Sequence, residues 1–292
     1  MIRTLLIAVA LAVIAPIAQA ARLEPDARII WDDADPEFGG FSGIEVRDNG
    51  AGFVAIGDRG VWATGRMIRE DGRLIGVENT GFGPLRAVSG RPVEPPNDDA
   101  EGLALDDRGR FYVSFEGFHR IRRYDAIDEA AQSVPRHPDF RRLQNNSGLE
   151  ALAVDGDGAL FAIPERSGRM TRPFPVYRLR DGVWTKPFAI PRIGSFLVAG
   201  ADFGPEGDLY LLERDFRWSG GFATRIRRFA LGADGLDGGE TLHETDFGST
   251  DNFEGISVWR DPEGHTRVTL VADDNFFTLQ STVIAEFLLI ED

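Results

Sequence analysis

Glu101-Gly102-Leu103-Ala104-Leu105 is one of five related stretches in this sequence, and their recurrence predicts the fold. The other four are Ser42-Gly43-Ile44-Glu45-Val46, Glu150-Ala151-Leu152-Ala153-Val154, Ala199-Gly200-Ala201-Asp202-Phe203 and Glu254-Gly255-Ile256-Ser257-Val258. Aligned on their first residues, the stretches are 59, 49, 49 and 55 residues apart. Periods of this size, filled with short strands and Gly/Asp turns, are typical of β-propeller blades.

A second apolar strand follows each stretch across a turn that contains glycine, as in a β-hairpin. We therefore predict an all-β chain with a single domain over residues 21–292, a β-propeller of five blades with four antiparallel strands each. Six blades are the alternative, because the 59-residue first interval has room for an extra hairpin. Only one clear strand, Thr282 to Leu289, follows the last pair, so Ala27 to Trp31 is expected to complete the final blade.

The first 20 residues have the pattern of a secretory signal peptide. Arg3 precedes an apolar run from Leu5 to about Ile17, and Ala18-Gln19-Ala20 supplies small residues for cleavage. The run is shorter than the roughly 20 apolar residues that span a membrane. We therefore expect a periplasmic or secreted protein with no membrane anchor after cleavage. The sequence does not indicate its oligomeric state.

Composition narrows the possible functions further. The chain has 292 residues, a net charge of -15 and no cysteine, so disulfides are excluded and the fold depends on core burial. An acidic chain lacks the clustered Lys and Arg that nucleic-acid binding needs, and no nucleic-acid partner is expected. Asp155-Gly156-Asp157-Gly158 is similar to the start of an EF-hand loop, but it joins two strands and is interpreted as a turn.

Carboxylates at the ends of paired strands are the candidate site. The start of one strand and the end of its antiparallel partner lie at the same edge of a sheet. This places Glu101 near Glu116 and Glu150 near Glu165, and the other blades bring further side chains to the same rim of the central channel. In those blades the expected neighbours are Ser42 with Asp58, Ala199 with Glu213, and Glu254 with Asp273 and Asp274.

Carboxylates that share one channel mouth repel one another unless a cation, protons or arginines compensate. Hard oxygen ligands suit Ca²⁺, with Mg²⁺ as the alternative. The opposing interpretation is that each acid pairs locally with an arginine or caps backbone N–H groups. The predicted metal ligands are Glu101, Glu150, Glu254, Glu213 and Asp274; the predicted anion-binding residues are Arg59, Arg166 and Arg214; and the remaining rim acids are Asp58, Glu116, Glu165 and Asp273.

Other catalytic chemistries have little support in the sequence. Ser42 lacks the strand-to-helix turn and the glycine spacing of a nucleophile elbow. The four histidines show no metal-binding spacing. No glycine-rich phosphate loop precedes a helix, which disfavours the usual nucleotide-binding folds.

From Phe41 to the C-terminus the chain resembles the phytase-like propeller family, whose members are labelled as having esterase-like activity. The resemblance lies in residues 98–104, 146–152, 161–165 and 251–256 and in Asp273-Asp274-Asn275. It implies an exported propeller that hydrolyses phosphoesters or carboxylesters with the help of calcium. A looser similarity connects the Glu-Gly pairs at Glu101 and Glu254 to calcium-dependent lactonase propellers, in which such a glutamate binds the metal.

Two functions of different classes follow from these observations. The first is a metal-assisted hydrolase of a small anionic ester, either a phosphoester, a carboxylester or a lactone. The second is a non-catalytic periplasmic binding or scaffold propeller whose calcium only holds the blades together. Hydrolysis that is lost on chelation separates the first from the second.

Overall fold

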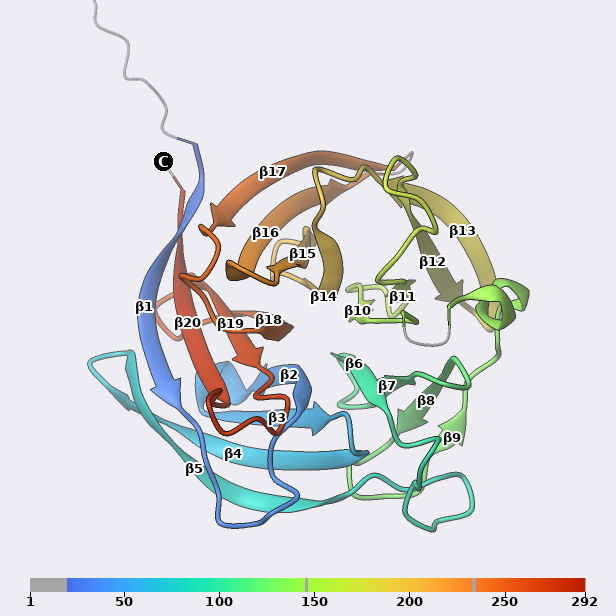
Figure 1. Ribbon diagram of the computed structural model, residues 1–292, viewed down its shortest axis with the longest axis horizontal. Helices are drawn as coiled ribbons and strands as arrows, with labels where there is room; N and C mark the ends of the chain where they lie inside the picture. The colour runs from blue at the N-terminus through green and yellow to red at the C-terminus, as the bar shows by residue number, and fades with distance from the viewer. Residues whose placement is uncertain (1–19, 145–146, 233–234, 292) are drawn as a thin grey trace, which may run out of the picture.

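A computed structural model describes residues 20–144, 147–232 and 235–291 of the chain. The leader predicted over residues 1–20 lies, except for its last residue, outside the described part. The strands form five four-stranded antiparallel sheets, arranged like blades around a central axis (Figure 1). The prediction of five blades is therefore confirmed, and the six-bladed alternative is wrong.

Each blade runs from an innermost strand at the axis to an outermost strand at the perimeter. Blade 1 contains β2 (Phe41–Arg47), β3 (Gly52–Gly57), β4 (Val61–Glu70) and β5 (Arg73–Pro84). Blade 2 contains β6 (Ala100–Leu105), β7 (Phe111–Phe115), β8 (Arg120–Tyr124) and β9 (Gln132–Ser133). Blade 3 contains β10 (Ala151–Val154), β11 (Leu160–Ile163), β12 (Phe174–Arg180) and β13 (Val183–Ile190). Blade 4 contains β14 (Leu197–Phe203), β15 (Leu209–Arg217), β16 (Gly221–Leu231) and β17 (Leu236–Glu244).

Blade 5 joins the two ends of the described chain. Its strands are β18 (Phe253–Arg260), β19 (Thr266–Ala272), β20 (Val283–Ile290) and, on the outside, β1 (Arg22–Ile30). β1 pairs antiparallel with β20, from Arg22 opposite Ile290 to Ile30 opposite Val283. The expected completion of the final blade by the N-terminal segment is confirmed.

The hydrophobic core is divided into five clusters, each between two neighbouring blades. Between blades 5 and 1, for example, Trp31 stacks on Phe41 with ring centroids 4.4 Å apart, and Phe53 meets the Trp31 ring edge-on at 5.0 Å. All three side chains are nearly or fully buried. The strands are apolar on both faces because each sheet is covered on both sides by its neighbours.

The hairpin turns are held by aspartates. Asp155 Oδ1 accepts the backbone N–H groups of Asp157, at 3.1 Å, and Ala159, at 2.8 Å. Asp106 Oδ1 does the same for Arg108 and Arg110, both at 3.0 Å. These side chains stabilise turns in the way that Asx motifs do, and the interpretation of residues 155–158 as a turn is confirmed.

Helical structure in the described residues is limited to two short 3₁₀ segments, η1 (Asp48–Gly50) and η2 (Pro138–Arg142). No described helix is long and apolar enough to cross a membrane. The architecture therefore consists of sheets and their connecting loops, and the loops on one end surround the channel mouth.

Candidate functional site at the channel mouth

A β-bulge lies at the first residue of the repeated stretch in each blade. The register between the inner strand and its partner slips between Phe41 and Gly43 and between Phe253 and Gly255, and blades 2 and 4 show the same slip. In blade 3, Ala151 pairs with Ile163 while the N–H of Glu165 donates to the Gly148 carbonyl at 3.1 Å. A bulge adds an unpaired residue and redirects its side chain. The bulged residues are Ser42, Glu101, Glu150, Ala199 and Glu254.

The residue after the bulge is glycine in four blades because the inner strands approach closely there. A Cβ on Gly102 would lie 2.8 Å from the carbonyl oxygen of Glu150, and one on Gly200 would lie 2.7 Å from that of Glu254. The space left between the inner strands is a cavity of only about 10 Å³. The channel is therefore nearly closed below the bulges, and the side chains at its mouth are open to solvent from one end.

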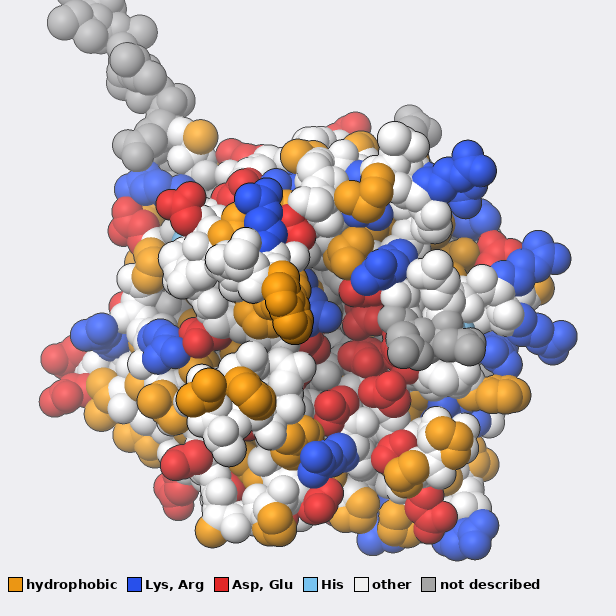
Figure 2. Space-filling view, in the orientation of Figure 1, with side chains coloured by type: hydrophobic (Ala, Val, Ile, Leu, Met, Phe, Trp, Pro, Cys, Tyr) orange, Lys and Arg blue, Asp and Glu red, His pale blue; other side chains and the backbone are white. Residues whose placement is uncertain are grey.

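Eight carboxylates surround a cavity of about 190 Å³ at this mouth. Figure 2 shows acidic side chains gathered at the centre of this face. Ser42 and Arg214 also line the cavity. We call the carboxylates the acid ring: Asp58, Asp99, Glu101, Glu116, Glu150, Glu165, Glu254 and Asp273.

Negative charge is strongly disfavoured in the acid ring. Burial, followed by repulsion from neighbouring carboxylates, raises the pKa of Asp58 to about 7 and that of Asp273 to about 8. The same two causes raise the pKa of Glu101 and of Glu150 well above the usual range. Carboxylates so placed either bind protons or need a cation to stay ionised at neutral pH.

Three members of the ring are close enough to share one ion. Asp99, Glu101 and Glu116 each offer an oxygen within 4.8 Å of the other two. Burial is also the main cause of the raised pKa of Asp99 and of Glu116. Asp99 hydrogen-bonds Glu101 through their side chains, and such a carboxyl–carboxyl contact needs a shared proton unless a cation replaces it.

Asp58 supplies a further sign that the ring is incomplete without a ligand. Its Oδ1 atom is buried and has no hydrogen-bond partner. A buried polar atom without a partner costs about 1–3 kcal/mol, so a ligand that coordinates or donates to it would be favoured. Oxygen donors at this density are the chemistry that Ca²⁺ binds, and the residues present fit that ion.

Among the described residues, Arg214 is the one cationic side chain on the cavity wall. Burial lowers its pKa, but the negative charges of Glu254 and Glu150 outweigh this effect, and the pKa is raised. Its guanidinium pairs with Glu254 and donates to Asn252 Oδ1 at 2.7 Å, while Asn252 Nδ2 donates to the same Glu254 carboxylate at 2.8 Å. Arg214 therefore lies at the channel mouth, and its predicted role in anion binding stays a prediction.

Glu213, predicted as a metal ligand, is placed elsewhere, and that expectation needs correction. Its fully buried carboxylate forms two hydrogen bonds with Arg227, at 2.7 and 2.8 Å, and lies 3.7 Å from Arg225. The bulge leaves Val198 opposite Glu213 and Leu197 opposite Arg214. Because successive side chains in a strand point to opposite faces, Arg214 reaches the channel mouth and Glu213 faces the sheet interior.

Asp274 lies beside the acid ring without lining its cavity. Its Oδ1 accepts the backbone N–H groups of Gly40, at 3.0 Å, and Phe276, at 3.1 Å. The side chain thereby holds two loops together, and Asp273, predicted only as a further rim acid, is the one that faces the cavity. Asp274, predicted as a metal ligand, is therefore not on the wall of this cavity.

Arg59 and Arg166, both predicted to bind an anion, also stand outside the cavity wall. The guanidinium of Arg59 lies 3.3 Å above the ring of Phe276 and 3.7 Å from Glu37. Arg166 donates to Glu165 at 2.8 Å and is half exposed. Arg166 thus contacts Glu165 of the acid ring, and Arg59 is the residue that follows Asp58 of the ring in the sequence.

Two groups of functional interest were missed by the sequence reasoning. Asp99 lies in the stretch that carries the family resemblance, two residues before Glu101, but it precedes the repeated five-residue stretch, so the pairing of strand ends does not predict its position. Glu45 and Asp202 occupy the fourth position of the repeated stretch and are buried. Each accepts a backbone N–H from the next blade, Glu45 from Leu105 at 3.1 Å and Asp202 from Val258 at 2.6 Å.

A family model described as "Phytase-like: Esterase-like activity of phytase" matches residues 36–276. This match covers blades 1 to 4, the strands β18 and β19 of blade 5 and the entire acid ring. No curated protein matches the sequence significantly.

Solved structures with the same fold have little sequence in common with this chain. An α-L-arabinofuranosidase from Podospora anserina, solved in complex with cellotriose, aligns with a TM-score of 0.54 at 11% identity, over 92% of this chain and 97% of that one. An endo-arabinase from Bacteroides thetaiotaomicron aligns with a TM-score of 0.52 at 13% identity, over 88% and 96%. At these identities the likeness concerns the fold alone.

Proposed function

The chain belongs to the phytase-like family of β-propellers, and we propose that it is a metal-assisted hydrolase of small anionic esters, phosphoric or carboxylic. The observation that carries this proposal is the acid ring. Eight carboxylates from four blades face one small cavity, where a single arginine offsets their charge. Burying so many carboxylates around one cavity costs free energy unless a bound cation compensates their charge.

Asp99, Glu101 and Glu116 are the residues best placed to hold the metal, because their oxygens already lie within 4.8 Å of one another. Glu150 and Glu254 face the same cavity and complete an oxygen-rich shell. A Ca²⁺ bound there would neutralise an anionic substrate and polarise its phosphoryl or carbonyl oxygen. Mg²⁺ is the second choice, since it needs stricter geometry and retains more water.

The remaining residues of the cavity suit the other requirements of ester hydrolysis. Asp58 faces the cavity outside the group of three, and its pKa of about 7 is in the range of an effective general base. Arg214 holds a fixed positive charge at the wall for a substrate oxygen that becomes negative. The cavity of about 190 Å³ admits the scissile group of an ester and leaves the rest of the substrate outside.

The alternative is a non-catalytic propeller whose calcium is structural, and the same ring supports it because a central ion would join blades 1, 2, 3 and 5. A calcium-dependent lactonase is a variant of the hydrolase proposal, supported by the Glu-Gly pairs at Glu101 and Glu254. For either function, the signal-like leader supports export to the periplasm or the medium.

The test compares purified protein lacking residues 1–20 in calcium and in chelator. We expect calcium at about 100 times its Kd to add about 2.7 kcal/mol of stability, and to activate hydrolysis of p-nitrophenyl phosphate, phytate, p-nitrophenyl acetate or a lactone. Glu101→Gln removes a ligand charge and should weaken calcium binding at least about tenfold. Glu263→Gln, an exposed turn substitution with the same charge change, is the control and should change neither quantity.

The outcomes separate the functions. Stabilisation by calcium without turnover of any ester would favour the structural alternative. If calcium changes neither the melting temperature nor hydrolysis, the proposal fails in both forms.

A further inference from the structure

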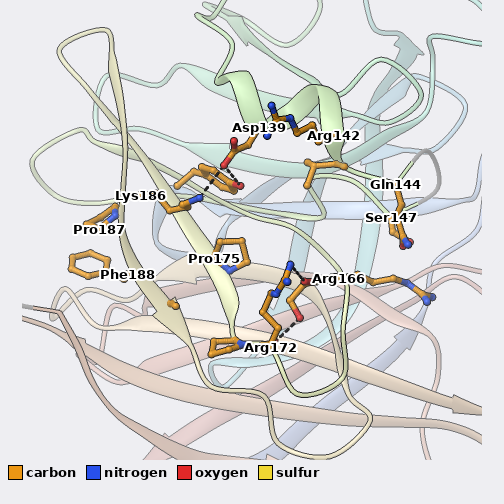
Figure 3. A pocket seen from close by; sticks show the side chains of 16 residues that line it. Asp139, Arg142, Gln144, Ser147, Arg166, Arg172, Pro175, Lys186, Pro187 and Phe188 are labelled. Atoms are coloured by element: carbon orange, nitrogen blue, oxygen red, sulfur yellow. Dashed lines mark hydrogen bonds and ion pairs between the residues drawn. The ribbon is translucent and has the colours of Figure 1, made fainter.

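A larger cavity, of about 780 Å³, lies on blade 3 (Figure 3). Its walls are η2, the described residues Leu143, Gln144 and Ser147 that come after it, the loop between β11 and β12, and the strands β12 and β13. We call this cavity the basic groove and define it by Arg142, Arg166, Arg172, Tyr177, Lys186 and Phe188.

The basic groove has the opposite charge to the rest of the protein. Four cationic side chains and one carboxylate, Asp139, line it, whereas the whole chain has a net charge of -15. Lys186 is paired with Asp139 at 2.9 Å, and Tyr177 donates to the same carboxylate at 3.1 Å. This leaves the arginines to determine which ligand the groove attracts.

Two of the arginines have no carboxylate partner within the described residues. Arg172 donates to the carbonyl of Ser167 at 3.4 Å, and Arg142 forms no ion pair. Both residues are exposed at the groove. A guanidinium presents several N–H donors in a planar fork that matches a phosphate or a carboxylate, so these two can bind an anion without first giving up a carboxylate partner.

The groove also has an apolar surface. Phe188 is half-buried, and Pro173, Pro175 and Pro187 lie along the wall with the ring of Tyr177. In Figure 3, Asp139 and Lys186 lie on one side of the groove and Arg172 on the other, with Pro175 between them. A volume of about 780 Å³ is within the usual range of about 300–1,000 Å³ for small-molecule sites. The ligand that fits this combination is an organic anion with a flat apolar group.

The groove and the acid ring share a wall. Arg166 lines the groove and donates to Glu165 of the acid ring at 2.8 Å. Ser147 lines the groove, and the N–H of the next residue, Gly148, donates to Glu116 of the acid ring at 2.6 Å. A ligand in the groove therefore lies next to the acid ring, behind residues that contact it directly.

We propose that the basic groove binds an organic anion, a phosphate or a carboxylate, through Arg142 and Arg172, with its ring against Phe188 and the prolines. Resting on the proposed hydrolase function, this anion is of the class that hydrolysis of a carboxylester or a phosphodiester releases, and the groove holds it beside the acid ring. Because binding there needs no metal, it can be measured separately from catalysis.

The experiment titrates metal-free protein with 1-naphthyl phosphate by calorimetry. We expect binding that weakens about tenfold or more in Arg172→Gln and in Arg142→Gln, since each substitution removes a charge-assisted contact. Arg108→Gln, in the exposed turn between β6 and β7, has the same charge change and should bind like the unmodified protein. 2-Naphthoate should also bind, whereas inorganic phosphate and 1-naphthalenemethanol should bind more weakly, because each lacks one of the two features.

A second variant locates the ligand. Glu101→Gln should keep its affinity for 1-naphthyl phosphate in metal-free buffer, although it loses calcium affinity. The inference is overturned if no binding occurs, if the groove variants bind like Arg108→Gln, or if binding requires calcium. Failure to hydrolyse any ester, with naphthyl phosphate binding intact, would instead remove the proposed function and leave the groove as a binding site.

Discussion

Glu213 and Arg214 are neighbours in β15, and they have different roles because successive side chains of a strand point to opposite faces. Arg214 reaches the acid ring and pairs with Glu254, whereas Glu213 is buried against Arg227. The sequence placed both at the strand end, which is correct, but a one-residue bulge in the partner strand determines which of them faces the channel. Bulges leave no clear signal in hydrophobic periodicity, so the sequence alone does not determine which of the two residues faces the channel.

Removing the Glu213 charge tests its structural role. Glu213→Gln leaves Arg227 buried without its carboxylate partner, and breaking a buried pair in this way costs about 3–5 kcal/mol. We expect urea denaturation to show a loss of this size with calcium affinity unchanged. Glu244→Gln is the matched control, because Glu244 also pairs with Arg225 but has a 47% exposed side chain, and such pairs contribute about 1 kcal/mol or less. Equal stability of the two variants would contradict the assignment.

At the scale of single elements, the inner strands were the most predictable part of the molecule. Their five repeats gave the number of blades, the position of each hairpin and the convergence of Glu101, Glu150 and Glu254 on one mouth. Asp99 was missed and Asp274 misplaced because both lie just beyond a strand, where loop geometry replaces the regular alternation of side chains. The sequence shows that glycine recurs after the bulged residue. The reason, close packing of the inner strands, follows only from the distances between those strands.

Gly255 provides the test of that packing. A Cβ there would lie 2.7 Å from the side chain of Val271 and 2.9 Å from the Cα of Gly43, so Gly255→Ala forces neighbouring inner strands apart. Overpacking of this kind costs about 1–3 kcal/mol, and we expect that loss in chemical denaturation. Gly156→Ala, in a turn with no atom within 4 Å of the added Cβ, should be close to neutral. If the two variants have the same free energy of unfolding, close packing does not explain the glycines.

For the whole molecule, the buried acids determine how stability depends on pH. Burial raises the pKa of Asp202 to about 7, and burial followed by the charge of Asp202 raises the pKa of Glu45 well above its usual range. The folded state therefore keeps protons that the unfolded chain releases near pH 4. This contribution to stability is fully present below pH 4 and is lost as the pH rises through about 7.

We accordingly expect the melting temperature, followed by circular dichroism, to fall between pH 5 and pH 8. Asp58 and Asp273, with pKa values raised to about 7 and 8 by burial and by neighbouring carboxylates, should steepen the fall in metal-free protein and contribute little when calcium is bound. Asp202→Asn, which stays neutral at every pH, should reduce the fall. A melting temperature that rises with pH in metal-free protein would show that these carboxylates are ionised in the folded state.

The pairing of β1 with β20 sets the order in which the chain can finish folding. During synthesis the ribosome releases β1 long before β20. β1 therefore has no strand to pair with until nearly the whole polypeptide has emerged. Until that moment blade 5 lacks its outer strand and the aromatic cluster around Trp31 cannot form. The blade that joins the two ends of the described chain is thus the last one that a newly made polypeptide can complete.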